Sequence, residues 1–143
     1  MTKSIPLLLA LAALADAPKP RSTEEMQMND PQEAKFTPAQ VPGLPPGPTV
    51  SPIAVDPSSK GSIAYARIPA KYHFPLHWHS YTEYTALISG SASFVLDGKP
   101  YELVPGSYFV IPPKTQHELT CGAAADCLLL TRRAGPTDYN FVK

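Results

Sequence analysis

This sequence has few cysteines, a formal net charge of zero and few long apolar runs. Of 143 residues only two are cysteines, too few to build a disulfide scaffold. Twelve Lys and Arg residues balance twelve Asp and Glu residues, so we expect no nucleic-acid partner, because binding by bulk charge needs a basic surface. The eight glycines show no triplet period, which excludes collagen. After the first twenty residues no apolar run is long enough to cross a bilayer.

The first fifteen residues have the layout of a secretory signal peptide. Lys3 supplies a positive charge, residues 5–14 are apolar except for Pro6, and Ala13 and Ala15 form a small-x-small cleavage site. About ten apolar residues are too few to cross the hydrocarbon core, which needs ~20. We therefore predict cleavage after Ala15, export to the periplasm or the medium, and no membrane span in the mature chain.

Proline and aromatic residues divide the rest of the chain. Ten of the 18 prolines lie between Pro18 and Pro57, whereas only Phe36 of the 13 aromatic residues lies before Lys60. A proline-rich segment has few amide donors and little to bury, so it tends to stay extended or disordered. We predict a disordered linker over residues 16–48 and a folded domain over residues 49–143.

The predicted folded domain is rich in short strands. No stretch of ten residues has helical periodicity, and Asp97-Gly98 between two apolar runs is typical of a hairpin turn. Many short strands with regular turns favour an all-β sandwich or barrel. The predicted strands span residues 62–68, 84–88, 91–96, 107–111, 116–120, 127–131 and 139–142.

Three histidines and a glutamate form a candidate metal site. His77 and His79 are two residues apart, which places both imidazoles on one face of a strand. Glu83 follows His79 by an even step, and His117 comes from a strand far along the chain. Three imidazoles and one carboxylate suit a first-row divalent metal. A lone histidine on a strand is more often a hydrogen-bonded structural residue, but this pair comes with two further ligand types.

These residues resemble the two sequence motifs of the cupin family. The first motif, G-x5-H-x-H-x3-E-x6-G, is matched from Lys71 through His77, His79 and Glu83 to Gly90. The second motif, G-x5-P-x-G-x2-H-x3-N, is matched by Gly106, Pro112 and His117, whereas Lys114 stands at its second glycine and Cys121 at its final asparagine. The resemblance covers roughly residues 60–132, and the sequence is similar to small single-domain exported bacterial cupins.

The resemblance implies a fold and a cofactor. The fold would be a double-stranded β-helix (jelly-roll) barrel that holds a divalent transition metal inside: iron, manganese, nickel, zinc or copper. The four positions that bind metal in cupins are filled here by His77, His79, Glu83 and His117. Lys71 and Lys114 replace turn glycines, which lysine tolerates where φ stays negative.

The two cysteines flank a short loop, residues 122–126, and a hairpin there would place them within reach of a disulfide. An oxidising compartment favours that bridge between Cys121 and Cys127. The alternative is a free thiol, since Cys121 shares strand parity with His117 and would then face the pocket. Tyr81, which has the parity of His79, and Tyr108, on a predicted strand, are further pocket candidates.

The sequence is compatible with three functions. The first is a metal-dependent enzyme acting on a small organic molecule, such as a dioxygenase-like oxidoreductase, an isomerase or a lyase, all of which occur in similar cupins. The second is a non-catalytic module that binds or senses a metal or ligand. The third is a metal-free structural barrel, which the intact ligand set disfavours. Edge strands leave a homodimer open as well.

Overall fold

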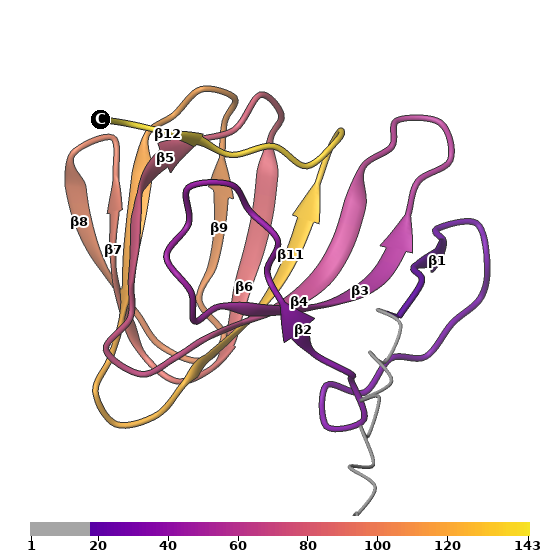
Figure 1. Ribbon diagram of the computed structural model, residues 1–143, viewed down its shortest axis with the longest axis horizontal. Coiled ribbons are helices and arrows are strands. Elements are labelled where there is room, and N and C mark those ends of the chain that lie inside the picture. The colour runs from indigo at the N-terminus through magenta and orange to yellow at the C-terminus, as the bar shows by residue number, and fades with distance from the viewer. Residues whose placement is uncertain (1–17) are drawn as a thin grey trace, which may run out of the picture.

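A computed structural model describes residues 18–143 (Figure 1). The predicted signal peptide, residues 1–15, lies outside the described residues. Within residues 18–143 no helix is long and apolar enough to span a membrane. The described chain forms twelve strands: β1 (Arg21–Ser22), β2 (Thr37–Pro38), β3 (Thr49–Val55), β4 (Ser62–Ile68), β5 (His73–Trp78), β6 (Glu83–Ser89), β7 (Ala92–Leu96), β8 (Lys99–Leu103), β9 (Tyr108–Ile111), β10 (His117–Cys121), β11 (Cys127–Arg133) and β12 (Asn140–Phe141).

The strands form two sheets that face each other, as the two sides of Figure 1 show. The seven-stranded sheet has the order β1-β3-β4-β11-β6-β9, with β2 also paired to β3, and the five-stranded sheet has the order β12-β5-β10-β7-β8. This is the predicted all-β jelly roll. All seven strands predicted from the sequence are present, with ends shifted by no more than two residues.

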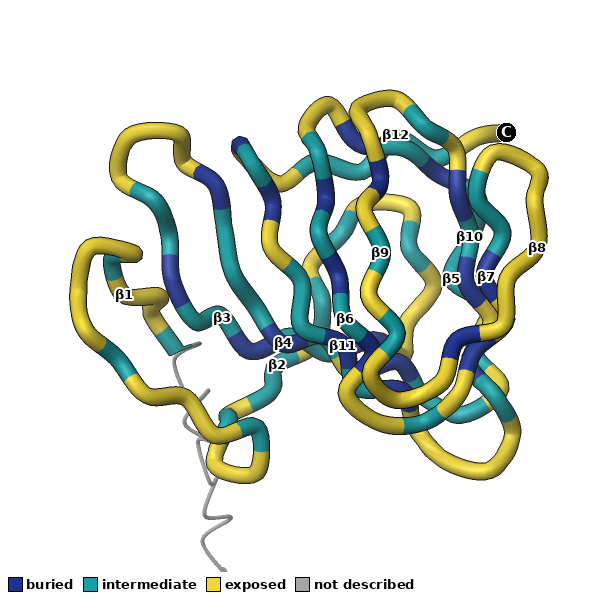
Figure 2. The backbone as a smooth tube through the Cα atoms, turned by 180° about the vertical axis from the view of Figure 1, so that it is seen from behind, coloured by how far each residue is buried: buried dark blue, intermediate teal, exposed yellow. Residues whose placement is uncertain are grey.

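The core lies between the sheets, because inward-facing residues alternate with outward-facing residues along the strands. Figure 2 shows buried residues recurring along β6, β7 and β10, whereas β8 is exposed over most of its length. The buried apolar cluster consists of Ile68, Leu87, Ala92, Phe94, Leu103, Ile111, Leu119, Cys121, Cys127 and Leu129.

Three turns bear on the backbone conformation expected from the sequence. Asp97 and Gly98 both have positive φ, 48° and 74°, and join β7 to β8 as the predicted hairpin. Lysine is tolerated in place of a turn glycine where φ stays negative, but Lys71 and Lys114 have φ of 65° and 62°. The motif turns therefore keep the left-handed conformation that glycine adopts without strain, although lysine occupies both.

Residues 18–48, predicted to be a disordered linker, are mostly extended without regular structure. Here the structure differs from a solvated linker, because β1 and β2 both pair with β3. The Tyr72 hydroxyl donates to the Pro45 carbonyl at 2.6 Å, and the Arg67 guanidinium lies 4.0 Å from the centre of the Phe36 ring. These contacts lay the segment along β3 and β4.

Candidate metal centre

Three histidine rings meet between the two sheets. His77 lies on β5, His79 follows that strand directly, and His117 begins β10, where it pairs with His77 across the ladder. The ring centroids are 4.2 Å (His77 and His117), 4.8 Å (His77 and His79) and 5.0 Å (His79 and His117) apart. All three rings are buried, and their ligand nitrogens lie within 4.8 Å of one another. The three histidines therefore form a cluster that could bind a metal ion.

The backbone fixes which nitrogen of each ring points inward. In every ring Nδ1 hydrogen-bonds to a main-chain carbonyl, which makes Nδ1 the protonated donor and leaves the lone pair on Nε2. The partners are Pro75 for His77 (2.7 Å), Asp138 for His79, and Thr115 for His117 (2.9 Å). This tautomer is the one that a metal-binding imidazole needs, so the donor set fits a divalent transition metal.

Glu83 lies beside the histidine cluster. It begins β6, and its Oε2 is 2.9 Å from His79 Nε2, while its Oε1 accepts a hydrogen bond from Thr85 Oγ1 at 2.8 Å. The alternating burial of β6 turns Glu83, Thr85 and Leu87 inward together. The structure thus brings all four predicted site residues into one place.

Arg133 belongs to the same site and was not anticipated from the sequence. Its Nη2 donates to Glu83 Oε2 at 2.6 Å, and lies 3.3 Å from His79 Nε2 and 3.2 Å from the Tyr139 hydroxyl. Its side chain is only 9% exposed. Strand parity could have found it, because β11 continues two residues beyond its predicted end and Arg133 then shares the inward face of Leu129.

Burial and neighbouring charges set the ionisation of the site. Burial, together with the nearby His117, lowers the pKa of His77 to about 3, and burial also lowers the pKa of His117. For Glu83 burial opposes ionisation, but the Arg133 guanidinium and His79 outweigh it and hold the pKa well below its usual range. The pKa of Arg133 is raised, because attraction to Glu83 outweighs the effect of burial. His77 and His117 are thus neutral and the Glu83–Arg133 pair is ionised.

A cavity of about 70 Å³ opens beside the cluster. His77, His117, Glu83 and Arg133 supply its polar wall. The rest of the lining is mainly aromatic and aliphatic: Ala66, Ile68, Phe74, Phe94, Phe109, Ile111, Leu119 and Leu129, with Thr85, Thr131 and Tyr139. A ligand of this cavity would therefore be small, with an apolar body and a polar end at the histidines.

The three other pocket candidates lie away from this cavity. Tyr81 sits in the turn between β5 and β6, outside any strand, so the parity argument does not apply to it, and it is 43% exposed. Tyr108 points outward from β9 and is 64% exposed, while its neighbour Phe109 lines the cavity. Cys121 is buried, but at the end of β10 remote from His117.

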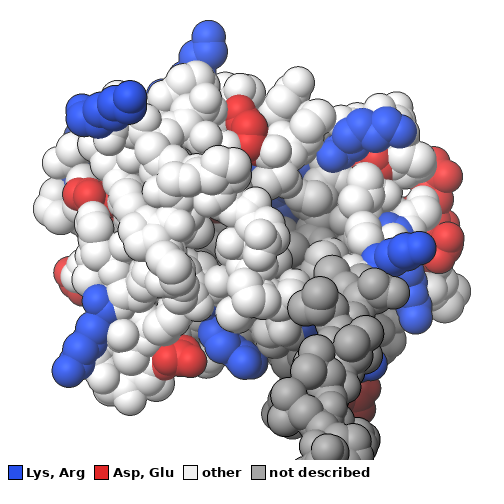
Figure 3. Space-filling model, in the orientation of Figure 1, with Lys and Arg blue, Asp and Glu red and all other residues white. Residues whose placement is uncertain are grey.

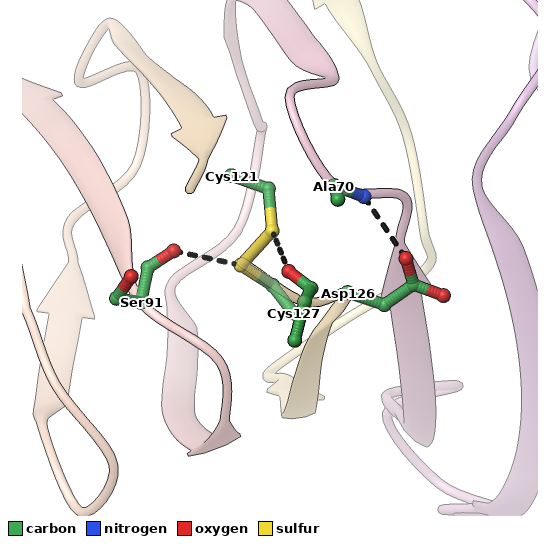
Figure 4. The surroundings of a disulfide bond; sticks show 6 residues. Ala70, Ser91, Cys121, Asp126 and Cys127 are labelled. Carbon is green, nitrogen blue, oxygen red and sulfur yellow. Dashed lines mark hydrogen bonds between the residues drawn. A yellow bond between two sulfur atoms is a disulfide. The ribbon is translucent and has the colours of Figure 1, made fainter. Parts of the chain in front are cut away.

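Cys121 and Cys127 form a disulfide, with their Cα atoms 5.9 Å apart (Figure 4). The bond joins β10 of the five-stranded sheet to β11 of the seven-stranded sheet. The Asp126 carboxylate beside it accepts a hydrogen bond from the Ala70 amide at 2.9 Å. His117 and Arg133 lie at the opposite ends of the same two strands, so the bridge fixes the end of the barrel remote from the histidines.

Residues 64–131 match the family model of the cupin domain. The chain belongs to the cupin family. Solved cupin-like structures support the same fold: the polyketide cyclase RemF from Streptomyces resistomycificus superposes with a TM-score of 0.67 and 19% sequence identity, covering 83% of this chain and 87% of the cyclase.

Two further structures are similar to this cupin. KdgF from a Halomonas species has a TM-score of 0.62 at 15% identity, over 77% of this chain and 94% of KdgF. A cupin 2 conserved barrel domain protein from Rhodopseudomonas palustris has a TM-score of 0.62 at 16% identity, over 78% of this chain and 79% of that one. Among curated proteins none matches the sequence. At these identities the structural likeness establishes the fold alone.

Proposed function

We propose that this cupin binds a small organic molecule at a divalent metal ion held by His77, His79, His117 and Glu83. The observation that carries the proposal is the common hydrogen bonding of the three histidines. Each ring donates through Nδ1 to a backbone carbonyl, which leaves Nε2 as the nitrogen that would bind a cation. In the metal-free site His79 Nε2 instead lies against Glu83 and Arg133. A purely structural histidine cluster would have no reason to arrange three lone pairs around one point.

Glu83 is the proposed fourth ligand. Its carboxylate is ionised, lies against His79 Nε2 and offsets part of a cation's charge. Arg133 shares the same oxygen of Glu83. The guanidinium therefore orients the carboxylate and keeps it unprotonated, with the other carboxylate oxygen bonded to Thr85.

A bound divalent metal would act as a Lewis acid that polarises an oxygen of the organic ligand. Iron, manganese, nickel, zinc and copper all suit imidazole and carboxylate ligands. A redox-active metal would favour dioxygenase-like oxidation, whereas zinc would favour isomerase or lyase chemistry. The three histidines and Glu83 would bind the metal, and Arg133 would orient Glu83. The apolar wall of the cavity would exclude water.

Metal content tests the proposal directly. Protein purified from its own host should contain about one equivalent of metal per chain, and His77→Ala should lose it. His73→Ala is the matched control, because His73 is exposed on the same strand and bonds Thr120 rather than the site. Equal metal content in His77→Ala and the parent protein would refute the site.

A second candidate is a non-catalytic binding or sensing module. The observation in its favour is that, among residues 18–143, Glu83 is the only carboxylate that lines the cavity and it is already paired with Arg133, so no further carboxylate there faces a ligand. Turnover of any small molecule by the metal-loaded protein, followed by oxygen uptake and by product analysis, would support the enzyme. Binding of small molecules without turnover would support the binding module.

We also propose that the protein is exported after cleavage behind Ala15. The disulfide supports this proposal, because such bonds persist in oxidising compartments. Fractionation of the native host, followed by N-terminal sequencing, should recover a mature chain that begins at Asp16. An intact N-terminus in the cytoplasmic fraction would refute it.

A homodimer through an edge strand is a further part of the proposal. β9 ends the seven-stranded sheet and presents Tyr108 and Val110 to solvent, 64% and 41% exposed. Apolar side chains on an unpaired edge favour association. Sedimentation equilibrium should give twice the chain mass, and Tyr108→Glu should restore the monomer. A monomeric parent protein would exclude it.

A further inference from the structure

The proline-rich connection between β2 and β3 forms a loop on the surface of the barrel. The two strands pair as far as Pro38 and Thr49, and the Ala39 amide then donates to the Pro48 carbonyl at 3.0 Å. Residues 40–47, here called the proline loop, therefore leave the hairpin and return to it at neighbouring points. Figure 1 shows this loop in front of the barrel, between β5 and β11.

The proline loop rests on side chains that border the cavity. Residues 40–42 form one side of a groove of about 230 Å³, and residues 137–139 form the other side. Tyr139 lines both this groove and the cavity beside the histidines. Gly43 packs closely enough that a Cβ atom there would lie 3.5 Å from the Phe141 ring, which stacks on Tyr139 with centroids 6.3 Å apart. Tyr139 thus forms a partition between the cavity and the groove under the loop.

The cavity is least enclosed on the side that the proline loop covers. Most residues that line the cavity are buried. The partly exposed ones are Ala66 on β4, Phe74 on β5, Phe109 on β9, Thr131 on β11, and Tyr139. Apart from Phe109, these residues come from β4, β5, β11 and the segment before β12, which are the elements that the loop spans in Figure 1. A ligand that approaches the cavity from this side meets the loop first.

The proline loop is held to the barrel by few polar contacts. Among residues 18–143, a single hydrogen bond joins it to the barrel: the Tyr72 hydroxyl donates to the Pro45 carbonyl at 2.6 Å. Three of its eight residues are prolines, which have no amide proton to donate. Gly47, at the end of the loop, has a φ of 143° and the freedom to absorb a backbone rotation. Segments with so few hydrogen bonds open at low cost in free energy.

We propose that the proline loop is a lid, which opens to let a ligand reach the histidines and which the hydrogen bond between Tyr72 and Pro45 holds closed. This inference rests on the proposed function, because it concerns access to the same site. None of the described residues 40–47 lines the cavity, so the lid does not touch a ligand bound there. It therefore controls how fast a ligand enters and leaves, and not how tightly the ligand binds.

Shortening the loop tests the lid. Because Ala39 and Pro48 are partners across the hairpin, a two-residue Asn-Gly turn can replace residues 40–47 without altering β2 or β3. The parent protein and the shortened chain are loaded with cobalt(II) and mixed with imidazole, and the visible spectrum of cobalt follows binding in a stopped-flow instrument. We expect imidazole to associate and dissociate roughly tenfold faster or more in the shortened chain, with the equilibrium affinity nearly unchanged.

A second variant tests the hydrogen bond that holds the lid, and it also covers the case in which the shortened chain does not fold. Tyr72→Phe removes the hydroxyl and keeps the ring. Tyr65→Phe is the matched control, because the Tyr65 hydroxyl donates to the Asn29 carbonyl at 3.2 Å, outside the proline loop. Loss of one hydrogen bond should speed imidazole association about threefold to tenfold in Tyr72→Phe and leave it unchanged in Tyr65→Phe.

The outcomes separate the lid from the site that it covers. Equal association rates in the parent protein, the shortened chain and Tyr72→Phe would overturn the lid and leave the metal site intact. An equal increase in Tyr72→Phe and Tyr65→Phe would also overturn it, since the effect would then be a general loosening of the fold. Failure to bind cobalt(II), or bound cobalt that does not respond to imidazole, would refute the proposed function and the lid together.

Discussion

Arg133 Nη2 and Glu83 Oε2 form an ion pair at 2.6 Å in which both side chains are 9% exposed. The pair links β11 to the first residue of β6, across neighbouring strands of the seven-stranded sheet, where Arg133 lies opposite Glu83 in the ladder. Both charged groups are buried away from water. Removing one partner therefore costs far more free energy than in a surface ion pair, because the other charge is left buried and unpaired. In contrast, the charged residues seen on the face in Figure 3 are dispersed, with no patch of one sign.

Arg133→Met should strongly destabilise the metal-free protein. It leaves the Glu83 carboxylate buried without its partner, which typically costs about 3–5 kcal/mol of unfolding free energy. Combining it with Glu83→Gln should recover part of the loss, because no charge then remains unpaired. Urea unfolding in EDTA measures both values, with Arg132→Met as the control. Strictly additive losses would contradict coupling across the pair.

The stability of the metal-free protein should rise with pH between about 3 and 6.5. The folded pKa of His77 is lowered to about 3 from an ordinary 6.5, so within this window the unfolded chain binds a proton that the folded chain does not. The contribution is complete above pH 6.5 and is lost as the pH falls towards 3. His77→Asn should reduce the slope of unfolding free energy against pH by up to about 1.4 kcal/mol per pH unit.

The control for this pH experiment is His73→Asn, whose exposed side chain bonds Thr120 outside the site. It should leave the slope close to that of the parent protein. If His77→Asn and the parent protein gave the same slope in EDTA, the burial of a neutral His77 would be wrong.

Replacing either motif lysine by glycine should stabilise the fold. Lys71 and Lys114 have positive φ, a conformation that costs an L-residue about 1–2 kcal/mol, part of which is offset by the greater freedom of glycine in the unfolded chain. We expect gains of roughly 0.5–1 kcal/mol in each variant by urea unfolding. Lys99→Gly, in strand β8 without a positive φ, should instead lose stability.

Replacing both cysteines by alanine should lower the unfolding free energy by about 2 kcal/mol, as expected for a small closed loop. Metal affinity should change little, because the bridge lies at the end of β10 and β11 remote from His117 and Arg133. Urea unfolding and cobalt titration of the same variant separate the two effects. Loss of the metal site would mean that the bridge holds the histidines in place as well.

Proline explains why three of the longer strands were not predicted from the sequence. β3, β5 and β8 each contain one: Pro52, Pro75 and Pro100. Proline cannot donate to a ladder, so it argues against a strand unless the strand lies at an edge or contains a bulge. Here β8 is an edge strand, and the ladders of β3 and β5 shift register beside Pro52 and Pro75. The edge position and the register shifts depend on how the strands pair, which cannot be read from the sequence.

The candidate site was predictable to the extent that it follows from motif spacing. His77, His79, Glu83 and His117 meet as the motif spacing predicts. Strand parity does not account for Glu83, because a turn at residues 79–82 separates β5 from β6. Arg133 depends on where β11 ends and on its contact with β6, and neither follows from spacing. Tyr81 failed as a pocket residue for the converse reason: parity was assumed across a turn.

The segment that includes Asp138 and Tyr139 has a consequence for biosynthesis. It supplies the carbonyl that accepts from His79 and the hydroxyl beside Arg133, and β12 then pairs with β5 alongside His77. These residues follow every other part of the site in the chain, so a ribosome must make them before the site is complete. Acquisition of the proposed metal would therefore be a late event in the life of each new molecule, after translation has passed residue 139.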